Sequence, residues 1–163
     1  MDAIRAALKG QYHAALGMLR KTVELFPDAT WTGTEHRNPP WQIAYHVLFC
    51  THAYLMPDWD SFRAWSGHRG DPKDDLPDGV EPYTRAEVLE YVAFCDAMID
   101  GAVDGCDLDA PESGFHWYRI PKLEHQLVNL RHLQHHTAQL QDRLRAAADV
   151  GVAWIASGRG PHP

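Results

Sequence analysis

The apolar positions of the first 26 residues recur at steps of three and four, the interval at which side chains return to one face of an α-helix. Polar and charged residues fill most of the positions between them. The pattern predicts a helix over about residues 2–25, ended by Pro27. The positions that carry it are Ile4, Leu8, Tyr12, Ala15, Leu19, Val23 and Phe26.

Residues 39–56 are apolar on nearly every side, which is typical of a helix that is buried all round. Asn38 stands before two prolines; asparagine is a favoured N-cap, and proline suits the first helical turn. We therefore expect a second, largely buried helix that begins after Asn38. His46 lies on its apolar surface, in line with Ile43 and Cys50, and no polar neighbour in the sequence could bond it.

A long connection follows over residues 57–83, and loops of this length without structure of their own are uncommon in compact domains. Its first part spaces Trp59, Phe62 and Trp65 as a short amphipathic helix would. Its second part, residues 67–82, is dense in glycine, proline and aspartate, so we expect an exposed and flexible segment whose charges are solvated.

Two further helices complete the chain. Thr84 and Glu87 form the sequence pattern of a capping box ahead of an apolar run that extends to about Gly105. Pro121 opens the last helix, which continues to about Asp149. The expected fold is all-α: a four-helix bundle over residues 1–150, with a long connection between its second and third helices and a tail over 151–163. The direction in which that connection carries the chain stays open.

Composition narrows the function classes. The chain has 163 residues, a net charge of −7 and no dense basic stripe, which excludes nucleic acid as an expected partner. No apolar run approaches the ~20 residues that cross a bilayer, so no membrane partner is expected either. The three cysteines are an odd and sparse set, and the first residues lack the apolar core of a signal peptide. We expect a cytoplasmic protein.

The last helix carries two adjacent stripes, one apolar and one polar, at about 100° per residue. The polar stripe borders the core, where a cleft between helices would lie. His132 and His136 stand one turn apart on it and could bind one metal ion, whereas His135 should face solvent. The apolar stripe holds Leu123, Leu127, Leu130, Leu133, Leu140 and Leu144; the polar stripe holds His125, Asn129, His132, His136, Gln139 and Arg143.

His46 is the natural third ligand for this pair. An unsatisfied buried polar group costs about 1–3 kcal/mol, and metal sites in helical bundles are built from inward side chains on facing helices. Three neutral imidazoles would leave open coordination positions, as catalytic sites do, and they suit Zn, Ni, Co or Fe. The plainer alternative is a satisfied core histidine on one helix and an incidental pair on the other. Cys50, one turn after His46, could approach the metal, although a role in the core is favoured.

Two other classes of metalloenzyme do not fit the pattern. His132 is followed by Leu133, where a zincin protease requires glutamate. The Glu-x-x-His pairs of di-iron bundle proteins are also missing.

The positions of Trp41, His46, the histidine pair and Gln139 resemble the DinB-like (YfiT-type) four-helix-bundle superfamily. The resemblance implies that His46, His132 and His136 bind a divalent metal. Many members carry arginine and glycine after the last histidine ligand, but this chain has Thr137 and Ala138. That departure leaves the three ligands in place.

The resemblance also implies an activity. Several relatives are transferases that add a low-molecular-weight thiol to an electrophile; other members suggest a metal-dependent hydrolase, or a non-enzymatic metal-binding stress-response or interaction module. We expect a small-molecule substrate, a thiol cosubstrate and a homodimer. Around the metal we expect Gln139, Asn129, Trp41 and Cys50, with the electrophile held against Trp41 or Trp117. The sequence identifies no general base.

Overall fold

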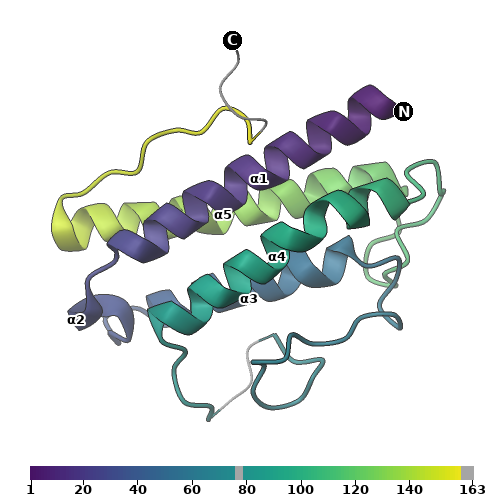
Figure 1. The fold of residues 1–163 in the computed structure, drawn as a ribbon. Helices are drawn as coiled ribbons and strands as arrows, with labels where there is room; N and C mark the ends of the chain where they lie inside the picture. Colours follow the sequence, from purple (N-terminus) through teal and green to yellow (C-terminus); the bar gives the residue numbers. More distant parts are fainter. Residues whose placement is uncertain (76–78, 159–163) are drawn as a thin grey trace.

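The computed structural model describes residues 1–75 and 79–158, and within these it contains five helices and no strand (Figure 1). The predicted all-helical class is therefore confirmed. The helices are α1 (Asp2–Leu25), α2 (Asp28–Trp31), α3 (Pro40–Leu55), α4 (Arg85–Gly105) and α5 (Lys122–Ala148).

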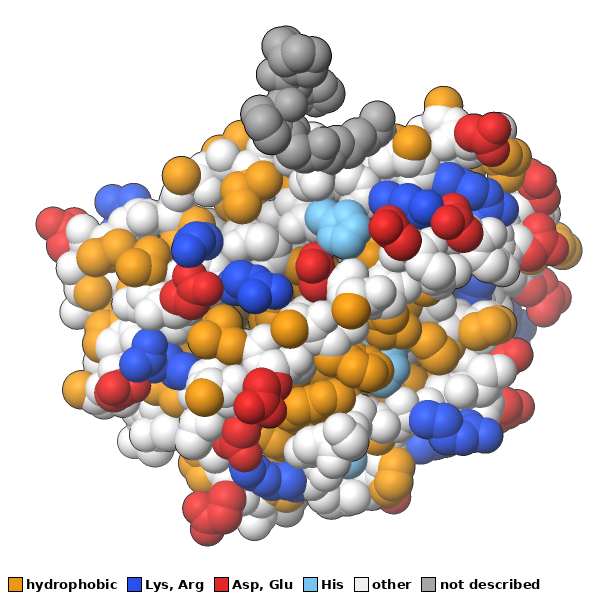
Figure 2. Space-filling model, viewed as in Figure 1, with side chains coloured by type: hydrophobic (Ala, Val, Ile, Leu, Met, Phe, Trp, Pro, Cys, Tyr) orange, Lys and Arg blue, Asp and Glu red, His pale blue; other side chains and the backbone are white. Residues whose placement is uncertain are grey.

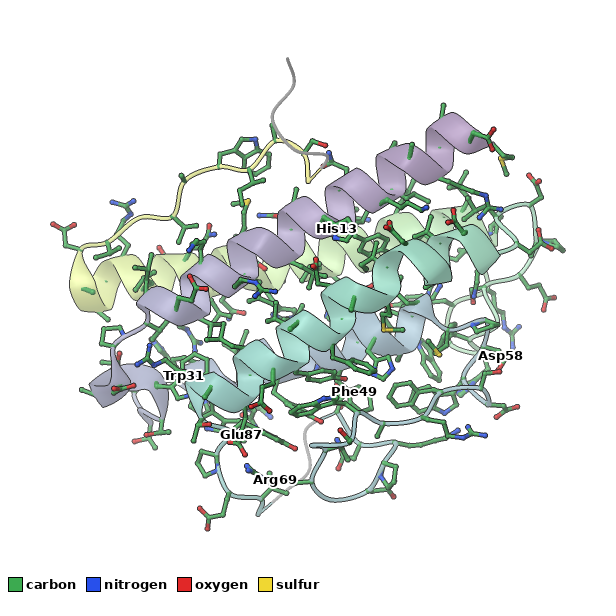
Figure 3. All side chains as sticks on the ribbon, viewed as in Figure 1. His13, Trp31, Phe49, Asp58, Arg69 and Glu87 are labelled. Carbon is green, nitrogen blue, oxygen red and sulfur yellow. The ribbon has the colours of Figure 1, made fainter. Side chains whose placement is uncertain are left out.

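The four long helices pack in a ring in which α1 and α3 each contact both α4 and α5. Figure 1 shows that α1 and α5 run in one direction, and that α3 and α4 run in the other. Side-chain contacts agree with this: Lys9 pairs with Asp104 at 2.7 Å, and His13 with Asp96 at 2.8 Å (Figure 3). Because α3 and α4 are parallel, residues 56–84 must return along the length of the molecule.

Two helix starts differ in how well the sequence predicted them. Thr84 and Glu87 form the expected capping box, with the Glu87 amide donating to Thr84 Oγ1 at 3.2 Å and the Thr84 amide to Glu87 Oε2 at 2.8 Å. Asn38, by contrast, is not the N-cap of α3. Pro39 takes that place without a side-chain cap, and the Asn38 carbonyl instead accepts a hydrogen bond from Arg143.

Two predictions about local structure were wrong. Residues 59–65 form a turn and an irregular segment instead of a helix. Packing of Phe62 on Phe49 and of Trp65 on Tyr91 buries both side chains without a helical backbone. Leu127 is 49% exposed, although the leucine pattern placed it in the core. The buried positions of α5 pass through Gln126 and Asn129, so Leu127 falls between them and points outward. The short helix α2 was not predicted.

The long connection is held against the helices where the sequence suggested only solvated surface. The ring of Tyr83 stacks on Tyr45 of α3 with centroids 4.2 Å apart. The Arg69 amide donates to the Tyr83 hydroxyl at 2.7 Å, and its guanidinium pairs with Glu87 at the start of α4 (Figure 3). Residues 70–74 are exposed as expected. Residues 76–78, to which the same prediction applied, lie outside the described chain, as do residues 159–163 of the tail.

The charges on the outside form no single-sign patch on the face shown in Figure 2, where acidic and basic side chains alternate around apolar ones. Across residues 1–75 and 79–158, no helix combines the length and apolar character that a membrane span requires.

Two histidines away from the predicted metal site are buried in the core. The pKa of His52 is lowered to about 4 by burial, and its Nδ1 lies 3.1 Å from the Tyr91 hydroxyl. The pKa of His125 is also lowered to about 4, by burial and by the charge of Lys122. Neither ring nitrogen of His125 has a hydrogen-bond partner among the described residues. Both side chains are therefore neutral in the folded protein at pH 7.

Acid should destabilise the fold through these two groups. A histidine whose pKa is depressed by folding binds a proton more readily in the unfolded chain, so its stabilising effect is present above pH 6.5 and is lost as the pH falls towards 4. We expect protonation of each histidine to lower the free energy of unfolding by on the order of 2–3 kcal/mol over that pH range. Urea unfolding at a series of pH values, with a chelator present, measures this.

His125→Leu isolates one of the two contributions, because leucine is apolar and His125 lies among the rings of Tyr54, Phe115 and Tyr118. The variant should show a flatter dependence of stability on pH than the wild type. His116→Gln, at an exposed position nearby, serves as the control and should leave the slope unchanged. An equal slope in His125→Leu and wild type would contradict the assignment.

Candidate metal centre

The structure brings His46, His132 and His136 together between α3 and α5. The two helices are antiparallel, and the Asn129 amide nitrogen bonds the Thr51 carbonyl at 3.3 Å, which sets their register. One turn further along α5, the histidine pair faces His46, whose ring centroid lies 5.2 Å and 5.1 Å from theirs. One nitrogen from each ring lies within 4.8 Å of the other two, a spacing at which the group could hold a metal ion.

Hydrogen bonds on the outer side of two rings determine which nitrogens face inward. Asp75 Oδ2 lies 2.6 Å from His46 Nδ1, and Gln139 Oε1 lies 3.1 Å from His136 Nδ1. Because both oxygens are acceptors, each Nδ1 carries the proton, which leaves Nε2 as a lone-pair donor. This arrangement of outer partners is the one that orients histidine ligands in metalloproteins.

The two nitrogens of the α5 pair make a strong case for a cation. His136 Nε2 lies 3.1 Å from His132 Nε2, while His132 Nδ1 is buried without a partner among the described residues. If His132 Nε2 carries the proton, a buried Nδ1 lone pair stays unsatisfied; if it does not, two lone pairs face each other. A divalent metal would satisfy the two facing Nε2 lone pairs, and Zn–N bonds of about 2.0–2.1 Å are compatible with such a separation.

The two site histidines on α5 are in the protonation state that binds metal. Burial lowers the pKa of His132 to about 4, helped by the neighbouring histidines, and burial also lowers the pKa of His136. The hydrogen bond from His46 is the main reason that the pKa of Asp75 lies below its usual range. At pH 7 the site therefore consists of neutral imidazoles on α5 and a charged carboxylate behind His46.

Cys50 is a neighbour of the site and a poorer ligand. Its sulfur lies 3.9 Å from both ring nitrogens of His46, so it is not aligned with the lone pair of either. Cys50, His46 and Asp75 are also close enough to form a second group that could hold a metal. Burial, with the charge of Asp75, raises the thiol pKa, however, and the three imidazoles need lose no proton to bind.

Of the other side chains expected around the metal, Gln139 and Asn129 lie near the histidines, whereas the two tryptophans do not. Gln139 contacts His136, and Asn129 is fully buried one turn before His132. Trp41 is instead buried beside Tyr83, and Trp117 is 41% exposed at the far end of α3, where it packs on Trp59. Neither indole is among the side chains that line the cavity at the histidines.

Asp75 is the part of the site that the sequence did not reveal. It follows Asp71 and Asp74 in an aspartate-rich stretch, and nothing in the local sequence distinguishes it from them. Only the return path of the long connection places its carboxylate on His46.

A cavity of about 310 Å³ opens at His46 and His136. A small ligand could therefore approach two of the three histidines from the side of α5 that carries Gln139. The remaining lining residues are Arg37, Asn38, Ile43, Gln139 and Arg143.

Comparison with known proteins identifies the family. A family model described as the DinB superfamily matches residues 11–140, most of the chain, and that span includes all three histidines. Neither a curated protein nor a solved structure gave a significant match. The chain belongs to the DinB superfamily.

Replacing a ligand should abolish metal binding. We expect His132→Ala and His136→Ala to retain well under a tenth of the metal that wild-type protein holds, because two remaining imidazoles bind a divalent ion weakly. Metal content of untagged protein after dialysis, determined by mass spectrometry, measures this. His135→Ala, at the exposed neighbouring position, and Cys50→Ser should keep full occupancy. Full occupancy in His132→Ala would refute its assignment as a ligand.

Asp75→Asn should weaken metal binding without removing a ligand. An amide can no longer stabilise the Nδ1–H of His46 as a carboxylate does, and loss of such a partner typically costs about 10–100-fold in metal affinity. Competition with a chromophoric chelator gives the dissociation constant. Asp60→Asn, at an exposed position in the same connection, is the matched control and should bind as tightly as wild type.

Proposed function

We propose that this DinB-superfamily protein binds a divalent transition metal through His46, His132 and His136, and that it transfers a low-molecular-weight thiol to an electrophilic small molecule. The observation that carries the proposal is the convergence of three imidazoles beside an open cavity. The described residues offer only three well-placed ligands, and a metal with unfilled positions is the hallmark of a catalytic site.

Each residue has a distinct part in this proposal. When bound, the metal supplies a Lewis acid that lowers the pKa of a coordinated thiol or water. Asp75 and Gln139 hold the rings of His46 and His136 with Nε2 turned inward. The cavity admits the substrate, whose electrophilic carbon forms a bond to the thiol sulfur while the leaving group departs with the bonding electrons and the thiol proton passes to solvent.

The environment favours a thiol over water as the nucleophile. Water bound to a metal has a pKa near 7 and is only partly ionised at neutral pH, so hydrolysis gains from a group that accepts its proton. Within the described chain, Asp75 is the one carboxylate placed at the three histidines, and it is already bonded to His46 Nδ1. A thiol loses its proton on binding a metal and therefore needs no such base. Metal-dependent hydrolysis is the second candidate, supported by the same open site.

A non-enzymatic role remains the alternative from a different class, in which the protein is a metal-binding stress-response or interaction module. We further infer that the four long helices form the family's four-helix bundle, with residues 56–84 as its long connection, and that the protein is a homodimer. Light scattering coupled to size-exclusion chromatography tests the dimer directly.

The transferase proposal predicts metal-dependent consumption of thiol. Protein loaded with one equivalent of zinc, nickel, cobalt or iron should accelerate the loss of free thiol when glutathione, bacillithiol or mycothiol is mixed with a panel of electrophiles. Chelation or His136→Ala should reduce the rate to that of the uncatalysed reaction, because the ligand set is then incomplete. Thiol titration and mass spectrometry of the conjugate measure the rate and the product.

The competing functions give different results in the same assay. Release of a hydrolysed product without consumption of thiol would indicate the hydrolase. Full metal occupancy with no turnover of any thiol or ester would count against catalysis and favour the non-enzymatic module.

A further inference from the structure

Two arginines line the cavity at the histidines, although the chain as a whole carries a net charge of −7. Arg37, from the segment between α2 and α3, and Arg143, from α5, both line it. No aspartate or glutamate is among its lining residues in the described chain. Two cations that line one cavity whose described lining holds no carboxylate favour the binding of an anion there.

Arg143 is held in place for this role. One guanidinium nitrogen donates to the Asn38 carbonyl at 2.6 Å, which fixes the end of the side chain against the segment that carries Arg37. Its other guanidinium nitrogens have no partner among residues 1–75 and 79–158, and the side chain is half-buried. Burial also holds the pKa of Arg143 below its usual value, which indicates a cation that has lost part of its hydration.

The chemistry of the guanidinium group selects the kind of anion. Its planar fork of donors matches the two oxygens of a carboxylate, and such charge-assisted bonds are among the stronger ones in proteins. Arg37 is exposed, with no partner in the described part of the chain, and so is free to close on the same group.

A second cavity, of about 500 Å³, shares Gln139 and Arg143 with the first and gives a ligand room to extend. Glu35 and Asp142 line this second cavity and not the first. They would repel a carboxylate placed there, so the favourable position for one is the first cavity, beside the histidines. His46 and His136 line the first cavity together with the two arginines, so one small molecule could contact both groups.

We propose that Arg37 and Arg143 recognise a carboxylate on the thiol cosubstrate, so that the protein selects carboxylate-bearing thiols over neutral or purely cationic ones. This inference rests on the proposed thiol transfer and deepens it by naming the substrate class. Arg37 and Arg143 are specificity residues in this scheme, and the histidines with their metal bind the sulfur end of the same molecule.

Binding to cobalt-substituted protein tests the proposal without any assay of turnover. Coordination of a thiol to cobalt produces a charge-transfer absorption band, which yields a dissociation constant for 3-mercaptopropionate, 2-mercaptoethanol and cysteamine in turn. We expect 3-mercaptopropionate to bind about tenfold or more tightly than the other two, the effect of one charge-assisted hydrogen bond or more.

Arginine variants identify the residues responsible. Arg143→Gln and Arg37→Gln should each weaken 3-mercaptopropionate about tenfold and leave 2-mercaptoethanol unchanged. Arg37 is exposed and has no hydrogen bond or ion pair to another described residue, so it keeps the test valid if Arg143→Gln alters the fold. Arg131→Gln, exposed on α5 and outside both cavities, is the matched control and should bind all three thiols as wild type does.

The possible failures are distinguishable. Equal affinity for 3-mercaptopropionate and 2-mercaptoethanol, or equal weakening of both in the arginine variants, would overturn the carboxylate site and leave thiol transfer standing. No thiol-dependent band in protein with full cobalt occupancy would overturn the proposed thiol transfer, and this inference with it.

Discussion

The polar seam between α3 and α5 is the constraint on which the rest of the structure depends. Successive α5 side chains donate to backbone carbonyls at and beyond the end of α3: Lys122 to Met56 and Pro57, Gln126 to Tyr54, and Asn129 to Thr51. These donors are buried, so each must be paired if its desolvation is not to cost stability. The bonds fix the register of the two helices. At the next inward positions of α5, His132 and His136 face the His46 ring and not a backbone carbonyl, so this series of side-chain hydrogen bonds to carbonyls stops there.

The direction of α4 then decides what stands behind His46. Since α3 and α4 are parallel, the connection between them must travel back along the helices, and its aromatic anchors at Trp65 and Tyr83 pack against Tyr91 and Tyr45. Asp75 lies between those anchors and reaches His46. An antiparallel pair joined by a short turn would have left His46 Nδ1 without this acceptor. The topology and the electrostatics of the site are therefore linked.

Features that depend on neighbouring residues could be predicted from the sequence, whereas features that depend on the path of the long connection could not. Helical periodicity is local, so the bounds of α1 and α4 and the one-turn spacing of His132 and His136 could be predicted from neighbouring residues. His46 could be singled out because a histidine in an apolar helix requires a partner. Asp75 could not, because its contact depends on the path of a whole connection. The prediction that Leu127 lies in the core was wrong for a related reason. Leucine spacing alone does not reveal that polar residues such as Gln126 and Asn129 occupy the inward face of α5.

The same seam gives a physical reason to expect an ion in place of a hydrogen-bonded cluster at the histidines. Elsewhere along α5, each inward amide or ammonium meets a carbonyl that accepts its protons. At the end of the seam, two imidazole nitrogens 3.1 Å apart can share at most one proton between them, and the Nδ1 of His132 has no acceptor in the described chain. Protonating either ring is disfavoured, because burial depresses the pKa of both. A divalent cation would accept both Nε2 lone pairs at once, which no arrangement of protons between the two rings can do. Of the ring nitrogens of His132 and His136, only His132 Nδ1 would then lack a partner in the described chain.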